Sequence, residues 1–136
     1  MLPFAVSIKP GESPYKQIVH AATKAILAGE LAQGSAFPSV RELSQSLKIN
    51  PNTAQKVVAE LTRERLLEVR PGIGTIVAAV GGRRASATDR KTLLSGDVEA
   101  LVVDARRLGL RKQEVIDAIA NTWDELFGGD ARAAAR

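Results

Sequence analysis

Residues 37–61, FPSVRELSQSLKINPNTAQKVVAEL, contain two helix-length amphipathic patterns separated by only a few residues. Ser39 and Glu42 have the S-x-x-E spacing of a capping box, which predicts that a helix begins at Ser39. Asn50 followed by Pro51 predicts a second start, because asparagine suits the N-cap and proline suits the first helical position. Two helices joined by so short a turn form a helix-turn-helix arrangement.

The neighbouring sequence extends this pair to a winged helix-turn-helix domain over residues 1–80. An apolar stripe at helical spacing predicts a first helix over about residues 15–28, preceded by an extended N-terminal arm. Strand-like runs at 66–70 and 74–78 flank RPGIG, whose glycines permit a tight hairpin. The sequence therefore predicts a mostly α fold with a small β-hairpin.

The rest of the chain is expected to form a linker, a two-helix segment and a tail. The linker, 81–87, is rich in glycine and charge, and the two-helix segment covers 88–128. Gly128 and Gly129 are expected to end the second helix and to leave 129–136 as a loose tail.

Within the two-helix segment, uninterrupted helices are expected from about 88 to 108 and from 112 to 127. Two amphipathic helices of this length cannot easily close a core alone, so their apolar stripes favour a two-fold dimer. Folding of the segment back onto its own domain is the alternative. The predicted dimer residues are Leu94, Val98, Leu101, Val102, Ala105, Ile116, Ile119, Trp123 and Phe127.

The outward face of the second helix of the pair is polar and suits the major groove of DNA. Asparagine and glutamine can pair with adenine, and a threonine methyl can contact thymine. Lys48 and Lys56 can neutralise phosphates, and a glycine at the hairpin tip permits close approach. The predicted residues for binding double-stranded DNA are Ser39, Arg41, Asn50, Asn52, Thr53, Gln55, Lys56, Arg70, Gly72 and Thr75.

Composition limits the other classes of function. The 136-residue chain has a formal net charge of +4, which favours polyanionic partners without requiring one. It has no cysteine, so disulfides, thiolate catalysis and thiolate zinc sites are excluded, and we expect no metal or cofactor. No catalytic motif occurs, and His20, the only histidine, is expected to be structural rather than catalytic. Because no catalytic motif occurs, we expect that the protein is not an enzyme. With no long apolar run and no signal-peptide pattern, we expect a cytoplasmic, non-membrane protein.

Residues 12–78 resemble the DNA-binding domain of the GntR family of bacterial regulators. The shared motifs are Y-x-Q-I, G-E-L, P-S-x-R-x-L-S, a threonine early in the recognition helix and a G-x-G-T-I-V wing. The resemblance implies that Arg41, the start of the recognition helix and the wing glycine touch DNA. This chain has Pro51 and Gln55 where the family often has arginines, and Ile73 where it often has a basic residue, which implies a different operator. It also has Arg65 where a glycine commonly follows the recognition helix.

The region beyond the wing resembles the two-helix tail of the YtrA-like branch, in which the tail helices form a dimer. The matching run is EALVVDARRLGLRKQEVIDAIANTWDELF. The resemblance implies a sequence-specific transcriptional regulator, expected to be a repressor that binds an inverted-repeat operator as a homodimer. Two alternatives stay open: a winged-helix protein-interaction module, and a metabolite-responsive regulator with a small effector site between domain and tail.

Overall fold

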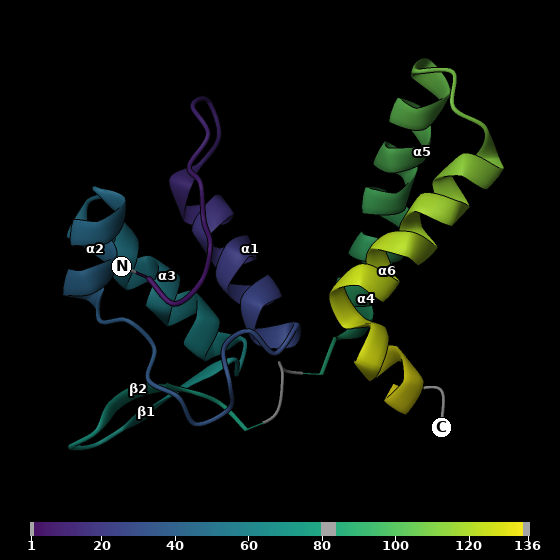
Figure 1. Cartoon of the computed structure of the whole chain (residues 1–136). Coiled ribbons are helices and arrows are strands. Elements are labelled where there is room, and N and C mark those ends of the chain that lie inside the picture. Colours follow the sequence, from purple (N-terminus) through teal and green to yellow (C-terminus); the bar gives the residue numbers. More distant parts are fainter. Residues whose placement is uncertain (1, 80–83, 135–136) are drawn as a thin grey trace. The chain divides into compact units, whose positions relative to one another are not determined.

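The computed structural model divides the chain into two compact units, Met1–Arg83 and Arg84–Arg136, here called the N-terminal and C-terminal units (Figure 1). Residues 2–79 and 84–134 are described, with side chains as far as Gly128. Of the predicted linker 81–87, the first three residues lie outside the described part, and a helix begins at Ala87.

The N-terminal unit contains three helices followed by a two-stranded antiparallel sheet. Leu67 lies opposite Val77 and Arg70 lies opposite Gly74 across this sheet. The order confirms the predicted winged helix-turn-helix fold. Its elements are α1 (Pro14–Leu27), α2 (Val40–Leu47), α3 (Pro51–Arg63), β1 (Leu67–Arg70) and β2 (Gly74–Val77).

Side chains cap the start of both helices of the helix-turn-helix. The Ser39 hydroxyl accepts from the Glu42 backbone N–H at 3.1 Å, and the Ser39 N–H donates to the Glu42 carboxylate at 3.2 Å. Ser39 itself is extended, so α2 begins one residue later than predicted, at Val40. The Asn50 side-chain oxygen accepts from the Asn52 N–H at 2.8 Å, as expected of an N-cap.

The core of the N-terminal unit is mostly aliphatic, with Phe4 and Phe37 as its aromatic members, and it joins the helices to the hairpin. Each fully buried side chain of this kind stabilises the fold by about 1.5–3 kcal/mol relative to exposure. The N-terminal arm also packs on this core, with the Phe4 ring stacked on Phe37 at 5.7 Å between centroids. The largest fully buried side chains are Ile18, Leu43, Val57, Leu61, Leu67 and Val77.

The C-terminal unit begins with a helix that is not uniform, contrary to the prediction of one α-helix over 88–108. It consists of α4 (Ala87–Lys91), a π-helical segment η1 (Thr92–Asp97) and α5 (Val98–Arg107). Gly96 lies within η1, and glycine weakens an α-helix by about 1 kcal/mol relative to alanine, which makes this a favourable place for irregular winding.

The last helix, α6 (Lys112–Ala134), extends beyond its predicted end at the two glycines. Residues 129–134 of the predicted tail continue this helix along the backbone, and residues 135 and 136 lie outside the described part. The backbone leaves helical geometry at Phe127 (φ −133°, ψ 24°) and then resumes it. Alanine has the highest helix propensity, so the alanine-rich sequence after Gly129 favours a new helical turn over an irregular tail.

Candidate nucleic-acid interface

The outer face of α3 exposes polar side chains together, as the sequence predicts. Asn52, Gln55 and Lys56 are exposed, and Thr53 is half-buried. The opposite face of α3 is held in the core by Ala54, Val57 and Leu61, which fixes the rotation of the helix about its axis. Amide and ammonium groups can therefore meet a groove without removing any core contact.

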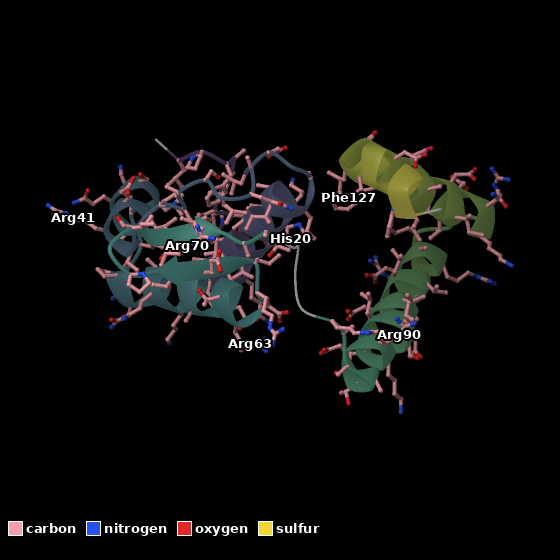
Figure 2. The ribbon with its side chains drawn as sticks, turned by 90° about the horizontal axis from the view of Figure 1, so that it is seen from below. His20, Arg41, Arg63, Arg70, Arg90 and Phe127 are labelled. Carbon is pink, nitrogen blue, oxygen red and sulfur yellow. The ribbon has the colours of Figure 1, made fainter. Side chains whose placement is uncertain are left out.

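The N-terminus of α2 brings Arg41 beside the capping box. Arg41 is exposed and lies at the outer edge of the N-terminal unit (Figure 2). Ser39 already has a structural task, because its hydroxyl and its N–H both bond to Glu42. The Glu42 carboxylate also places a negative charge at this helix end, so Arg41 is the group there that suits a phosphate or a guanine.

Asn50 likewise combines a predicted DNA contact with a structural role. Its side-chain oxygen is used by the Asn52 N–H, and Pro51 between them has no N–H to satisfy. The amide nitrogen of Asn50 is the part that remains to donate to a phosphate. The first turn of α3 thus depends on a residue that can also face DNA.

The tip of the hairpin is a tight turn with little side-chain bulk. The Ile73 N–H donates to the Arg70 carbonyl at 3.0 Å, with Pro71 and Gly72 between them. Gly72 has φ +77°, the left-handed conformation that the third position of a type II turn requires and that glycine adopts without strain. A Cβ added at Gly72 would meet no atom within 4 Å, so this backbone is open to close approach.

The remaining predicted wing residues, Arg70 and Thr75, differ in their surroundings. Arg70 forms an exposed ion pair with Glu68 at 3.0 Å, and such a pair is weak enough to be exchanged for a phosphate. Thr75 is half-buried, and its carbonyl accepts from the Phe37 N–H at 2.9 Å. Thr75 therefore joins the wing to the preceding loop through its backbone, in addition to any contact with DNA.

Known proteins match both the winged domain and most of the chain. Residues 14–77 match the bacterial regulatory proteins of the gntR family. The uncharacterized HTH-type transcriptional regulator YhcF of Bacillus subtilis (strain 168) is 36% identical over 107 residues, which cover 77% of this chain and 85% of YhcF. The chain belongs to the gntR family. Like other members, it is a DNA-binding transcriptional regulator and not an enzyme.

The similarity continues into the C-terminal helices of this GntR protein. The HTH-type transcriptional repressor YtrA of the same Bacillus strain is 29% identical over 126 residues, covering 91% of this chain and 96% of YtrA. This coverage confirms the predicted YtrA-like type. A solved structure, described as a transcriptional antiterminator from Listeria monocytogenes EGD-e, covers 90% of this chain and 91% of its own with a TM-score of 0.73 and 24% identity, and shows the same fold.

Two basic residues of this GntR domain adopt left-handed backbone conformations. Lys48 (φ 54°) lies between α2 and α3, and Arg65 (φ 61°) follows α3; among the described residues no other non-glycine has positive φ. The resemblance implies a glycine at this position, and glycine adopts a left-handed backbone conformation without strain. The sequence indicated a departure at Arg65 but not the backbone strain that accompanies it.

The far end of α3 is occupied by ion pairs rather than by free cations. Arg63 contacts Glu60 at 2.7 Å and Glu64 at 2.8 Å, and the hydrogen bond and charge of Glu60 raise the pKa of the Arg63 guanidinium. Figure 2 places Arg63 and His20 well away from Arg41 within the N-terminal unit. His20 is exposed on α1.

The predicted dimer residues lie mostly on the surface of the C-terminal unit. Ala105 is buried between α5 and α6, and Phe127 is half-buried, with its ring edge-on to Trp123 at 5.9 Å. The other seven are 42–59% exposed and lie on η1, α5 and α6: Leu94, Val98, Leu101, Val102, Ile116, Ile119 and Trp123.

Neither a metal site nor a membrane-spanning helix occurs in the part of the chain that the structure describes. Among the described residues, no group of three or more histidine, cysteine or acidic side chains is arranged to hold a metal ion. In the same part of the chain, no helix combines the length and apolar character needed to cross a membrane.

Proposed function

We propose that this GntR protein is a transcriptional repressor that binds an inverted-repeat operator as a homodimer. One observation carries the proposal: nine large hydrophobic side chains are exposed on η1, α5 and α6. A small monomer rarely exposes so many on one pair of helices, whereas a second copy covers them through a two-fold interface.

The operator follows from this symmetry. Two copies of α3 held by one two-fold interface present their polar faces to successive major grooves, about 34–36 Å apart on one side of the duplex. A two-fold protein reads a two-fold sequence, so each half-site is an inverted copy of the other. The second half-site then binds intramolecularly, which raises affinity by orders of magnitude over a single domain.

Specificity is assigned to the outer face of α3. Asn52 and Gln55 are exposed amides that can pair with adenine, and Thr53 offers a methyl group. Arg41, Lys56 and Arg70 supply phosphate contacts from three different elements. A polar outer face also argues against the alternative of a winged-helix module that binds another protein, because such a module needs an apolar face there.

The direction of regulation is inferred from the named relative. YtrA is called a repressor, and it matches this chain along 91% of its length. An operator overlapping a promoter would be occupied in competition with RNA polymerase, which is the simplest route to repression. Since its target is the bacterial chromosome, the protein is expected to act in the cytoplasm without a cofactor.

The central experiment is selection of bound sequences from random duplexes by the full chain, followed by titration on the recovered operator and on scrambled DNA. Asn52→Ala and Gln55→Ala should each cost about 1–3 kcal/mol on the operator and little on scrambled DNA. Equal losses on both DNAs would show that these amides do not read bases. Recovery of a single, non-repeated site would contradict the symmetric operator.

Assembly and direction are tested separately. Sedimentation of the full chain at micromolar concentration should give a dimer, and deletion of residues 86–136 should give a folded monomer with much weaker operator binding. Transcription in vitro from a promoter carrying the operator should fall as the protein is added. A full-length monomer would refute the homodimer, and a rise in transcription would refute repression.

A further inference from the structure

We infer that Ile73 is a minor-groove wedge: an apolar side chain at the wing tip that enters the groove of operator DNA and partly unstacks one base step. The inference rests on the proposed operator binding and adds a contact of a different chemical kind. Ile73 is 72% exposed and Val69, on the adjoining strand, is 63% exposed.

The turn holds Ile73 in a fixed position at the end of the hairpin. Pro71 restricts its own φ, and the turn is closed by the hydrogen bond from the Ile73 N–H to the Arg70 carbonyl. The flanking Gly72 and Gly74 both have positive φ, which glycine adopts without strain. A rigid tip is expected to lose little conformational entropy when it enters a groove.

The two glycines also make the tip narrow. A Cβ added to either Gly72 or Gly74 would meet no atom within 4 Å, so Ile73 is the one side chain between two bare stretches of backbone. The minor groove of B-DNA is about 6 Å wide and 7.5 Å deep, which admits a single side chain on such a tip but not a broad hairpin. Isoleucine belongs to the apolar residues that proteins insert between base steps from this groove.

Charge and position favour DNA as the occupant. The segment from Arg70 to Thr75 contains no acidic residue, and the nearest carboxylate, Glu68, is ion-paired with Arg70. In Figure 1 the turn between β1 and β2 points toward the side of the N-terminal unit where α2 lies, and Figure 2 places Arg41 at that same side. The wedge therefore belongs to the end of the unit that carries the predicted DNA contacts.

A protein partner is a poorer occupant for this tip. Stable protein interfaces bury about 800 Å² on each partner. The apolar surface at the tip consists of Ile73 and Val69, and the neighbouring tip residues are glycines and a proline. One protruding side chain on a rigid turn suits a deep, narrow groove better than a flat protein surface.

A wedge changes which sequences bind well. Unstacking is easiest at pyrimidine–purine steps such as TA and CA, so the operator should prefer such a step where the wing enters. This preference needs no hydrogen bond to a base edge and no charge. Replacement of Ile73 should therefore alter affinity and step preference while the salt dependence of binding stays the same.

The test uses the full chain and its selected operator, with 2-aminopurine placed in turn at each adenine of the duplex, because its fluorescence rises on unstacking. One position in each half-site should brighten on binding of the parent protein. Ile73→Leu should keep this signal, and Ile73→Ala should lose it together with about a tenfold loss of affinity. Exchange of the flexible step for a stiff AA step should lower the operator affinity of the parent protein but hardly change that of Ile73→Ala.

The outcomes separate the wedge from the proposed function. Tight operator binding without any fluorescence rise, or with a rise that persists in Ile73→Ala, overturns the wedge and leaves the repressor proposal standing. Failure of the full chain to select any operator overturns both. Equal loss of affinity on flexible and stiff steps in Ile73→Ala also overturns the wedge, because the side chain would then contribute only general contact.

Discussion

Replacing Arg65 by glycine should stabilise the N-terminal unit, although it removes a charged side chain. Arg65 follows α3 with φ 61°, and the chain closes the helix through two backbone bonds. The Arg65 N–H donates to the Thr62 carbonyl at 3.0 Å, and the Leu66 N–H donates to the Leu61 carbonyl at 2.9 Å. This is the Schellman arrangement, in which the residue at Arg65 must be left-handed.

The size of the effect follows from two opposing contributions. A residue with a Cβ in the left-handed region costs roughly 1–2 kcal/mol. Glycine removes that cost, but it also increases the conformational entropy of the unfolded chain, which stabilises the unfolded state by about 0.5–1 kcal/mol. The exposed Arg65 side chain contributes little packing, so the net gain should be about 0.5–1 kcal/mol.

Arg65→Ala is the matched control, because it removes the same charge and keeps the Cβ. Arg65→Gly should raise the thermal unfolding midpoint of the N-terminal unit by about 2–8 °C, since 1 kcal/mol corresponds to about 4–8 °C in a domain of this size. The midpoint is measured on the full chain at one fixed concentration. Arg65→Ala should show no such rise. Equal midpoints for the two variants would refute strain at this position.

Three further perturbations test the site and the assembly. Asn50→Ala should cost about 1 kcal/mol in urea unfolding because the Asn52 N–H loses its cap, whereas Asn50→Ser should retain most of the stability; equal losses would reject the capping role. Lys56→Gln should flatten the slope of log affinity against log salt by about one unit, and an unchanged slope would mean that Lys56 faces solvent. Trp123→Asp should give a monomer in sedimentation with its helical circular dichroism kept, and a persistent dimer would remove Trp123 from the interface.

Much of the N-terminal unit could be predicted because its signals are local. The bonds that start α2 join residues three apart, so S-x-x-E in the sequence is already the geometry of the cap. Asn50 and Pro51 define the start of α3 in the same way. The spacing of Ala54, Val57 and Leu61 fixes which face of α3 is buried, and the polar residues must then lie outside.

The features that the sequence did not predict are backbone conformations whose alternatives differ little in free energy. The π-helical segment and the continuation of α6 beyond Phe127 both involve glycine in a helix, where about 1 kcal/mol separates one backbone path from another. Arg65 is a different case, because a non-glycine residue prefers negative φ and the packing of its neighbours imposes a positive φ instead. Leu66 is buried, and the chain can reach that position only if the preceding residue is left-handed.

The site shows a further limit of sequence reasoning, because several of its residues have two tasks. Ser39 and Asn50 were predicted as DNA contacts, and each also caps a helix that presents the other contacts. A loss of DNA affinity in Ser39→Ala or Asn50→Ala therefore has two physical causes, a missing contact and a frayed first turn. Measuring the unfolding free energy beside the DNA affinity separates these causes. If a different capping residue at the same position recovers both stability and affinity, the original side chain contributed by capping the helix and not by contacting DNA.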